Sequence, residues 1–208
     1  MSSISVAGDV SGAISIAAPS AAGSGTLTLP VATDTLVGKA TTDTLTNKSI
    51  AATQLTGTIA ASVLPAGSVL QVVNATYATQ VSNATNTFIT TNLTATITPR
   101  SASSKILVLA HVAGVYKTTA SGLSVSLRLY RGASSIVGFE ANGAYSTGGS
   151  ASSGTSSTAY LDSPATTSAT TYTVYFNSSS NAATAFVQNY NITQADSTST
   201  ITLMEIQG

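Results

Sequence analysis

The sequence contains no cysteine, so neither a disulfide framework nor a thiolate metal site can form. Charged residues make up only 7 %, seven basic against seven acidic, which excludes the strongly basic surface of an ordinary nucleic-acid-binding protein. No run of roughly 18 apolar residues is present, and we therefore expect no membrane insertion. The first residues, MSSISVAGDV, lack the basic and apolar regions of a secretory signal, so we expect no export by that route.

Aromatic residues are absent from the first part of the chain. All eight tyrosines and four phenylalanines lie at or beyond Tyr77. Aromatic side chains bury the largest areas, up to ~250 Å² each, and a stretch of Ala, Ser, Thr and Gly cannot easily offset its backbone entropy with a core of its own. We therefore expect a slender, partner-dependent arm (residues 1–66) followed by a compact head (residues 67–208), with the boundary at Pro65, Ala66 and Gly67.

The arm begins with short period-two patterns that Gly and Pro interrupt, which predicts short strands. Three parallel copies would bury the apolar residues of these strands about a three-fold axis and would pair the strand edges between chains. The candidate residues for anchoring the arm are Ile4, Val6, Ile14, Ile16, Leu27 and Leu29.

In the head, strand patterns recur between turn clusters. Val125, Leu127 and Leu129, for example, alternate with polar residues, and one apolar face opposite one polar face is typical of antiparallel sheets. The fold class that we predict is all-β: an extended N-terminal trimerising arm followed by an antiparallel β-sandwich head of jelly-roll-like type. The expected strands are Ser68–Val73, Phe88–Thr98, Lys105–Tyr116, Leu123–Tyr130, Ser135–Phe139, Thr158–Leu161, Thr171–Asn177, Thr184–Asn189 and Thr198–Ile206.

The Gly/Ser-rich run Ala141–Ser157 is the longest apparent loop. Loops longer than ~12–15 residues are usually functional or disordered, and tyrosines among Ser, Gly and Asn are typical of binding surfaces. The candidate receptor contacts are therefore Asn142, Tyr145 and Tyr160. In the alternative interpretation, Tyr160 is a core strand residue and Tyr145 anchors the loop.

Catalytic groups are sparse. The single histidine, His111, lies in the middle of an expected strand, and no GxSxG motif or cysteine nucleophile is present. We assign His111 a structural role, with an ion bound at a three-fold axis as the alternative. Glu140 and Asp162 flank the Gly/Ser-rich run, and a glycosidase would need such carboxyls ~5–9.5 Å apart. No recognisable pair exists in the sequence, so we expect no enzyme, no cofactor and no metal.

Two arginines near the end of one expected strand offer a further binding chemistry. Arg128 and Arg131, with Tyr130 between them, could stack on or hydrogen-bond a sugar acid. The alternative is a solvated strand end opposite Glu140.

Two segments resemble bacteriophage tail fibres, especially those of phages of cyanobacteria and other aquatic bacteria. The first is TLTLPVATDTLVGKATTDTLTNKSI (Thr26–Ile50), which is similar to a module of fibre shafts. The second is TITPRSASSKILVLAHV (Thr96–Val112), with SVLQVVN before it and STSTITLMEI near the C-terminus. Together these resemble the C-terminal head domain of such fibres.

The resemblance implies a structural virion protein that forms a homotrimer and is extracellular after release of the particle. Its arm would attach to another phage virion protein of the tail, baseplate or capsid, and its head would bind a host surface polysaccharide. Two alternatives remain open: a capsid fibre or decoration protein without receptor binding, and a polysaccharide depolymerase.

Overall fold

In the computed structural model the chain forms two compact units, Met1–Thr56 and Gly57–Gly208. In the first unit, β1 (Ser3–Ala7) and β2 (Ala13–Ala17) pair antiparallel, with Ile4 opposite Ile16 and Val6 opposite Ile14. Leu27 and Leu29 lie outside the described residues. The structure describes residues 3–7, 13–17, 49–51, 53, 57, 59–60, 63–118, 123–146, 153–181, 183–188 and 197–208.

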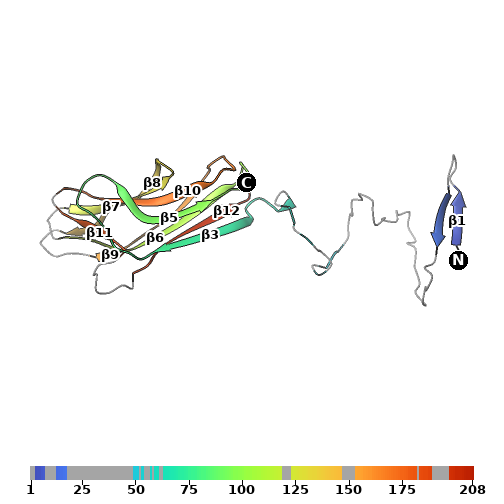
Figure 1. Ribbon diagram of the computed structural model, residues 1–208, viewed down its shortest axis with the longest axis horizontal. Helices are drawn as coiled ribbons and strands as arrows, with labels where there is room; N and C mark the ends of the chain where they lie inside the picture. The colour runs from blue at the N-terminus through green and yellow to red at the C-terminus, as the bar shows by residue number, and fades with distance from the viewer. Residues whose placement is uncertain are drawn as a thin grey trace. The chain divides into compact units, whose positions relative to one another are not determined.

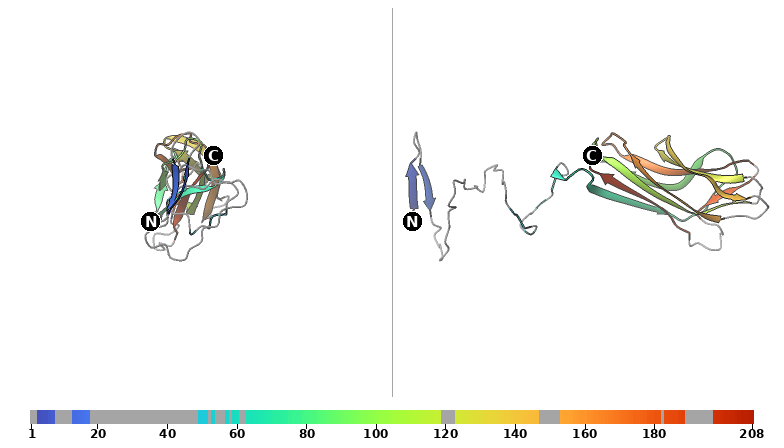
Figure 2. Two further views of the ribbon diagram at one scale, coloured as in Figure 1. Left: turned by 90° about the vertical axis from the view of Figure 1, so that its right-hand side faces the viewer. Right: turned by 180° about the vertical axis from the view of Figure 1, so that it is seen from behind.

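The second unit is a sandwich of two antiparallel sheets that lie face to face (Figures 1 and 2). The four-stranded sheet has the order β5 (Ile89–Ile97), β10 (Thr170–Ser178), β7 (Leu123–Arg131) and β8 (Ser134–Ser146). The six-stranded sheet has the order β3 (Val69–Tyr77), β12 (Ser199–Ile206), β6 (Lys105–Lys117), β11 (Ala185–Val187) and β4 (Val81–Asn83), and β9 (Ser153–Asp162) pairs with β6. The predicted all-β sandwich is confirmed.

The core lies between the sheets and is built by alternation along each strand. Val125, Leu127 and Leu129 of β7 are fully buried, while Arg128 between them is exposed. Burying one such aliphatic side chain stabilises the fold by roughly 1.5–3 kcal/mol. The largest apolar members of the core are Leu93, Ile97, Ile106, Leu127, Leu129, Tyr172, Phe176, Ile201 and Leu203.

A polar cluster links the two sheets at one point of this core. The Tyr172 hydroxyl donates to the Asp162 carboxylate at 2.7 Å, and Arg131 Nη1 lies 2.9 and 3.0 Å from the two carboxylate oxygens. Tyr172 and Arg131 belong to the four-stranded sheet and Asp162 to the six-stranded sheet. Burial raises the pKa of the Tyr172 hydroxyl, and its hydrogen bond to Asp162 raises it further. The cluster therefore fastens one sheet to the other.

The prediction of a long loop at Ala141–Ser157 is wrong. Strand β8 continues to Ser146, and β9 already begins at Ser153. The Ser- and Gly-rich start of β9 lies along β6, with Ser156 opposite Val112 and Ser157 opposite His111. The start of β9 has no alternating apolar pattern of its own. It is a strand because its backbone pairs with the long apolar strand β6.

Among the described residues, helical structure is nearly absent. Within the part of the chain that the structure describes, no helix is long and apolar enough to cross a membrane.

Candidate functional site

The outer face of the four-stranded sheet carries an unusual set of side chains. On β7 the residues in phase with exposed Arg128 are Ser126 and Tyr130, because Leu127 and Leu129 point into the core. On β10, Tyr175 is in the same outward phase, since its neighbours Val174 and Phe176 are fully buried. Strand alternation therefore places two tyrosines and an arginine on a face that water can reach.

The pairing of β7 with β10 brings these side chains together. Tyr175 lies directly opposite Arg128, and Tyr130 lies opposite Thr173. The rings of Tyr130 and Tyr175 approach with their centroids 4.2 Å apart and their planes tilted by 32°. Such ring pairs are worth ~0.5–1.5 kcal/mol beyond the area that they bury. The two rings form a half-buried aromatic surface.

Phe88, just before β5, extends this surface. The Arg128 guanidinium carbon lies 4.3 Å from the centroid of the Phe88 ring, which is the geometry of a cation–π contact. The N–H groups of a guanidinium form a rigid fork of donors. We call Phe88, Arg128, Tyr130 and Tyr175 the aromatic–arginine platform.

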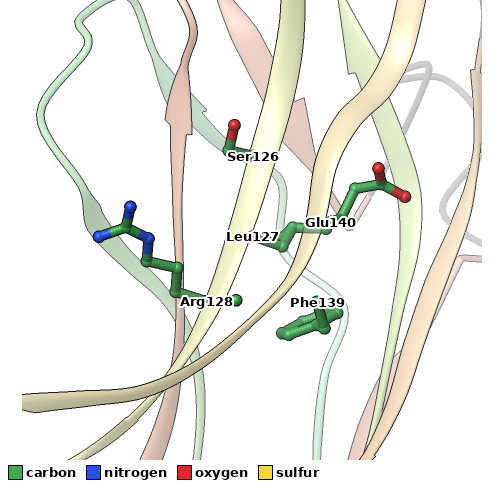
Figure 3. Close-up of a pocket in the computed structure, with 6 residues that line it drawn as sticks. Ser126, Leu127, Arg128, Phe139 and Glu140 are labelled. Carbon is green, nitrogen blue, oxygen red and sulfur yellow. The ribbon is translucent and has the colours of Figure 1, made fainter.

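A pocket of about 420 Å³ adjoins the platform. Arg128 and Glu140 lie on opposite sides of Leu127 in this pocket, with Phe139 beside them (Figure 3). Gly138 is the residue directly opposite Arg128, and a Cβ added to it would lie 3.9 Å from Arg128 Cγ. Because Gly138 has no side chain, the space beside the arginine stem stays open. The lining residues are Ser126, Leu127, Arg128, Gly138, Phe139 and Glu140.

The chemistry of platform and pocket suits a sugar. The apolar C–H face of a pyranose ring packs on aromatic rings, while its hydroxyls need donors and acceptors arranged around it. The platform supplies the rings and Arg128 supplies donors, while the Glu140 carboxylate lies on the other side of Leu127, 3.4 Å from the Ser156 hydroxyl. A pocket of a few hundred Å³ with a few convergent polar groups is the usual form of a small-ligand site.

The residues that the sequence suggested as receptor contacts do not gather at this site. Tyr160 is half-buried, packs against the hydrophobic core and lies opposite Val108 of β6. This position agrees with the alternative interpretation of Tyr160 as a core strand residue. Asn142 and Tyr145 belong to β8, and their side chains lie outside the described residues.

The carboxyl pair considered for glycoside hydrolysis is not formed. Glu140 Oε2 lies 3.4 Å from the hydroxyl of Ser156, whereas Asp162 stands six residues further along the same strand β9. Six residues of strand span ~20 Å, more than twice the ~9.5 Å upper limit for such a pair. Asp162 is instead engaged by Arg131 and Tyr172.

His111 and the remaining acids suggest no metal site. His111 Nδ1 lies 2.9 Å from the Ser157 hydroxyl across the β6–β9 pairing. No group of three His, Asp or Glu side chains able to hold a metal occurs among the described residues.

Glu205 is buried, and burial alone would raise the pKa of its carboxyl. Its hydrogen bonds from Gln71 Nε2 and the Arg100 backbone N–H, both at 2.6 Å, outweigh that effect and lower the pKa.

Sequence reasoning considered Arg128 and Arg131, with Tyr130 between them, for binding a sugar acid, with a solvated strand end as the other interpretation, but it missed Phe88, Phe139 and Tyr175. A signal for Tyr175 was present, because this residue is in phase with the polar Thr171 and Thr173 rather than with the buried Tyr172. An aromatic residue on the polar face of a strand is a hint of binding. Arg131, the other predicted arginine, contacts Asp162 rather than the platform.

Comparison with models of known protein families gives no match, and comparison with curated proteins gives none either. Among solved structures, the chain is similar to the VP2 subviral particle of infectious bursal disease virus, with a TM-score of 0.37 and 11 % identity over 65 % of this chain. Structures of the Gt and Gx strains of that virus give TM-scores of 0.38 and 0.34 with 14 % and 13 % identity, each over 67 % of this chain. The chain spans only 38 % of the length of each of these proteins. At such scores the likeness does not extend to function.

Proposed function

We propose that this protein is a structural, non-enzymatic attachment protein of a bacteriophage fibre, and that its head binds a host surface glycan at the aromatic–arginine platform. The observation that carries the binding proposal is the convergence of Phe88, Arg128, Tyr130 and Tyr175 beside an open pocket. The viral assignment rests on the resemblance of the arm and head segments to phage tail fibres. The homotrimer and the docking of the arm on another virion protein rest on the same resemblance.

A polar binding site of this kind agrees with the composition of the chain. Its formal net charge is zero, so general electrostatic attraction contributes little to a partner's affinity. Recognition must then depend on local contacts, which stacked rings and the Arg128 guanidinium provide for a sugar. A ligand with a carboxylate would be held by the Arg128 fork, and a neutral ligand would use the rings and hydroxyl contacts alone.

Filling the pocket tests the binding proposal with little risk to the fold. Gly138 does not require a left-handed backbone, and the nearest atom to an added Cβ is 3.9 Å away. We expect Gly138→Leu combined with Arg128→Ala to weaken adsorption to host cells at least tenfold, since truncating an interface hot spot costs about 2 kcal/mol or more. Adsorption is measured with labelled protein, and thermal melting monitors the fold.

Two further variants serve as comparisons. Thr94→Ala changes an exposed threonine on the same outer face, away from the pocket, and should leave adsorption unchanged. Asn142→Ala with Tyr145→Ala tests the contacts first suggested by the sequence. If this second pair abolishes adsorption while the filled pocket does not, the platform is not the receptor site. If neither affects adsorption, a decoration protein without receptor binding becomes the better assignment.

The proposal that the protein is not an enzyme has a separate test. Incubation with host polysaccharide should release no new reducing ends. Release that Glu140→Gln abolishes would show a depolymerase and would contradict the proposal.

A further inference from the structure

The outer face of the six-stranded sheet, on the opposite side of the sandwich from the platform, carries an exposed apolar row. Val72 of β3, Met204 of β12, Leu107 of β6 and Leu161 of β9 are direct cross-strand neighbours in that order. Each of these side chains points outward, because the residues before and after it in the strand point toward the core. Val72 and Leu161 at the two ends are 56 % and 51 % exposed.

Adjacent rows enlarge this surface and add one charged residue, Lys105, at its end. On one side, Leu109 is 37 % exposed and lies opposite Ala159 and Thr202. On the other side, Val69 is 52 % exposed and lies opposite Ile206. We call the whole surface the outer apolar face. Its remaining outward residues are Asn74, Thr76, Thr200, His111 and Ser157.

Four polar residues of the outer apolar face already pair with one another. Asn74 Nδ2 donates to the Thr202 hydroxyl at 2.8 Å, and His111 Nδ1 lies 2.9 Å from the Ser157 hydroxyl. Covering such a surface costs less than covering polar groups whose only partner is water. Lys105, opposite Ile206 at one end, is the charged residue that borders the face.

We propose that the outer apolar face is the surface through which heads of this protein associate with one another. Lys105 lies at the end of the face, so two copies of the face meet with little like-charge repulsion, whereas a strongly charged partner would find little that is complementary on it. Four strands ~4.8 Å apart and four rows ~6.7 Å apart give the face an area on the order of 500 Å². That is more than half of the ~800 Å² that each partner buries in a standard interface, so the strand ends around it need to supply only the rim.

The number of chains that associate is taken from the proposed homotrimer. The choice of the surface through which they associate does not depend on it. Association through this surface leaves the platform free, because the two surfaces are the outer faces of opposite sheets. A self-associating head therefore presents several binding sites outward, and their combined avidity exceeds the affinity of one site.

Charge introduced at the face tests the proposal in the full-length chain. Light scattering on wild type should give a multiple of the 20.7 kDa chain mass, three-fold for the proposed trimer. We expect Val72→Lys with Leu161→Lys to reduce the mass at micromolar concentration, with melting unchanged because both positions are exposed. The matched control, Thr94→Lys with Thr96→Lys, adds the same charge to exposed positions on the opposite sheet and should keep the wild-type mass. A wild-type mass of one chain would overturn the proposal. A mass of two chains would agree with association through the outer apolar face but would overturn the trimer.

Association through the arm alone would keep the mass of the lysine variant, so a second measurement locates the contact. The chain has no cysteine, and one introduced thiol therefore reports on a single position. Leu109→Cys, near the centre of the face, should form chain-to-chain cross-links with a short bis-maleimide, and Thr94→Cys should not. Equal cross-linking of the two variants overturns the proposal. The lysine variant should still bind glycan at its single site, so failure here is distinguishable from failure of the proposed function.

Discussion

Asp162 is the residue on which the link between the two sheets depends. It is 6 % exposed, and its carboxylate contacts both the Tyr172 hydroxyl and the Arg131 guanidinium. Tyr172 is fully buried, so its hydroxyl has no access to water as a substitute partner. Removing one partner of such a cluster leaves the others unsatisfied, which costs more than the hydrogen bonds themselves contribute.

We therefore predict that Asp162→Ala destabilises the sandwich by about 2–4 kcal/mol, somewhat less than the ~3–5 kcal/mol for breaking a fully buried pair, because Arg131 keeps some contact with water. Tyr172→Phe removes one hydroxyl and leaves the Arg131–Asp162 pair, so it should cost less, about 1–2 kcal/mol. Urea denaturation followed by circular dichroism measures both. Equal midpoints for Asp162→Ala and wild type would show that the cluster contributes nothing to stability.

At the scale of single elements, the turn between β7 and β8 and the register shifts that follow it set the position of the pocket. Arg131 pairs with Ser134, so Gly132 and Ala133 form a two-residue hairpin loop. Gly132 has a φ of +56°, while Ala133 is not in the left-handed region. This is the pattern of a hairpin turn that requires glycine at its first position. The turn fixes the pairing of Arg131 with Ser134 and of Tyr130 with Ser135, and the register shift between Leu129 and Tyr130 then places Gly138 opposite Arg128.

Gly132→Ala should destabilise the protein by about 1 kcal/mol, since a left-handed conformation costs an L-residue ~1–2 kcal/mol. The cause is backbone strain alone, because no atom lies within 4 Å of the added Cβ. Ala133→Gly is the control and should change stability only slightly. Thermal melting of the three proteins checks this, and a Gly132→Ala variant as stable as wild type would show that the turn relaxes to another type.

The strands of the sandwich were largely predictable, and the exceptions have physical reasons. Where apolar residues alternate, as in β7 and β10, the sequence places strands within one or two residues of the observed ends. The start of β9 has no such pattern, because Ser, Gly and Thr there pair with β6 through the backbone alone. This first part of β9 was therefore predicted to be a loop.

The candidate site was less predictable than the fold. Its rings come from Phe88, Tyr130 and Tyr175, which belong to three separate segments of the chain. Only the order of strands β5, β10 and β7 in the sheet makes them neighbours, and a single sequence does not fix that order. The separation of Glu140 from Asp162 likewise follows from pairing rather than from proximity along the chain.

At the scale of the whole molecule, the two units have different tasks in the proposed fibre. The unit Gly57–Gly208 contains the hydrophobic core, the platform and the outer apolar face. The unit Met1–Thr56 has no aromatic residue and contains the β1–β2 pair in which four of the six anchor candidates lie. Under the proposed function, glycan binding is assigned to the unit Gly57–Gly208 and attachment to the particle to the unit Met1–Thr56.

We predict that deleting residues 1–30 leaves a folded protein that binds glycan but is no longer incorporated into phage particles. The deletion removes all six anchor candidates and no residue of the sandwich. Melting and glycan binding should match the full-length chain, because the core cluster and the platform are intact. Incorporation is measured by quantifying the protein on purified virions after complementation with the deleted gene. A matched variant, Ile4→Ser with Ile16→Ser, changes only one cross-strand pair of the arm and should give a partial loss. Deleted protein present on virions at normal stoichiometry would place the anchor in residues 31–66 or in the head. A head that unfolds without residues 1–30 would instead show that the two units depend on each other for stability.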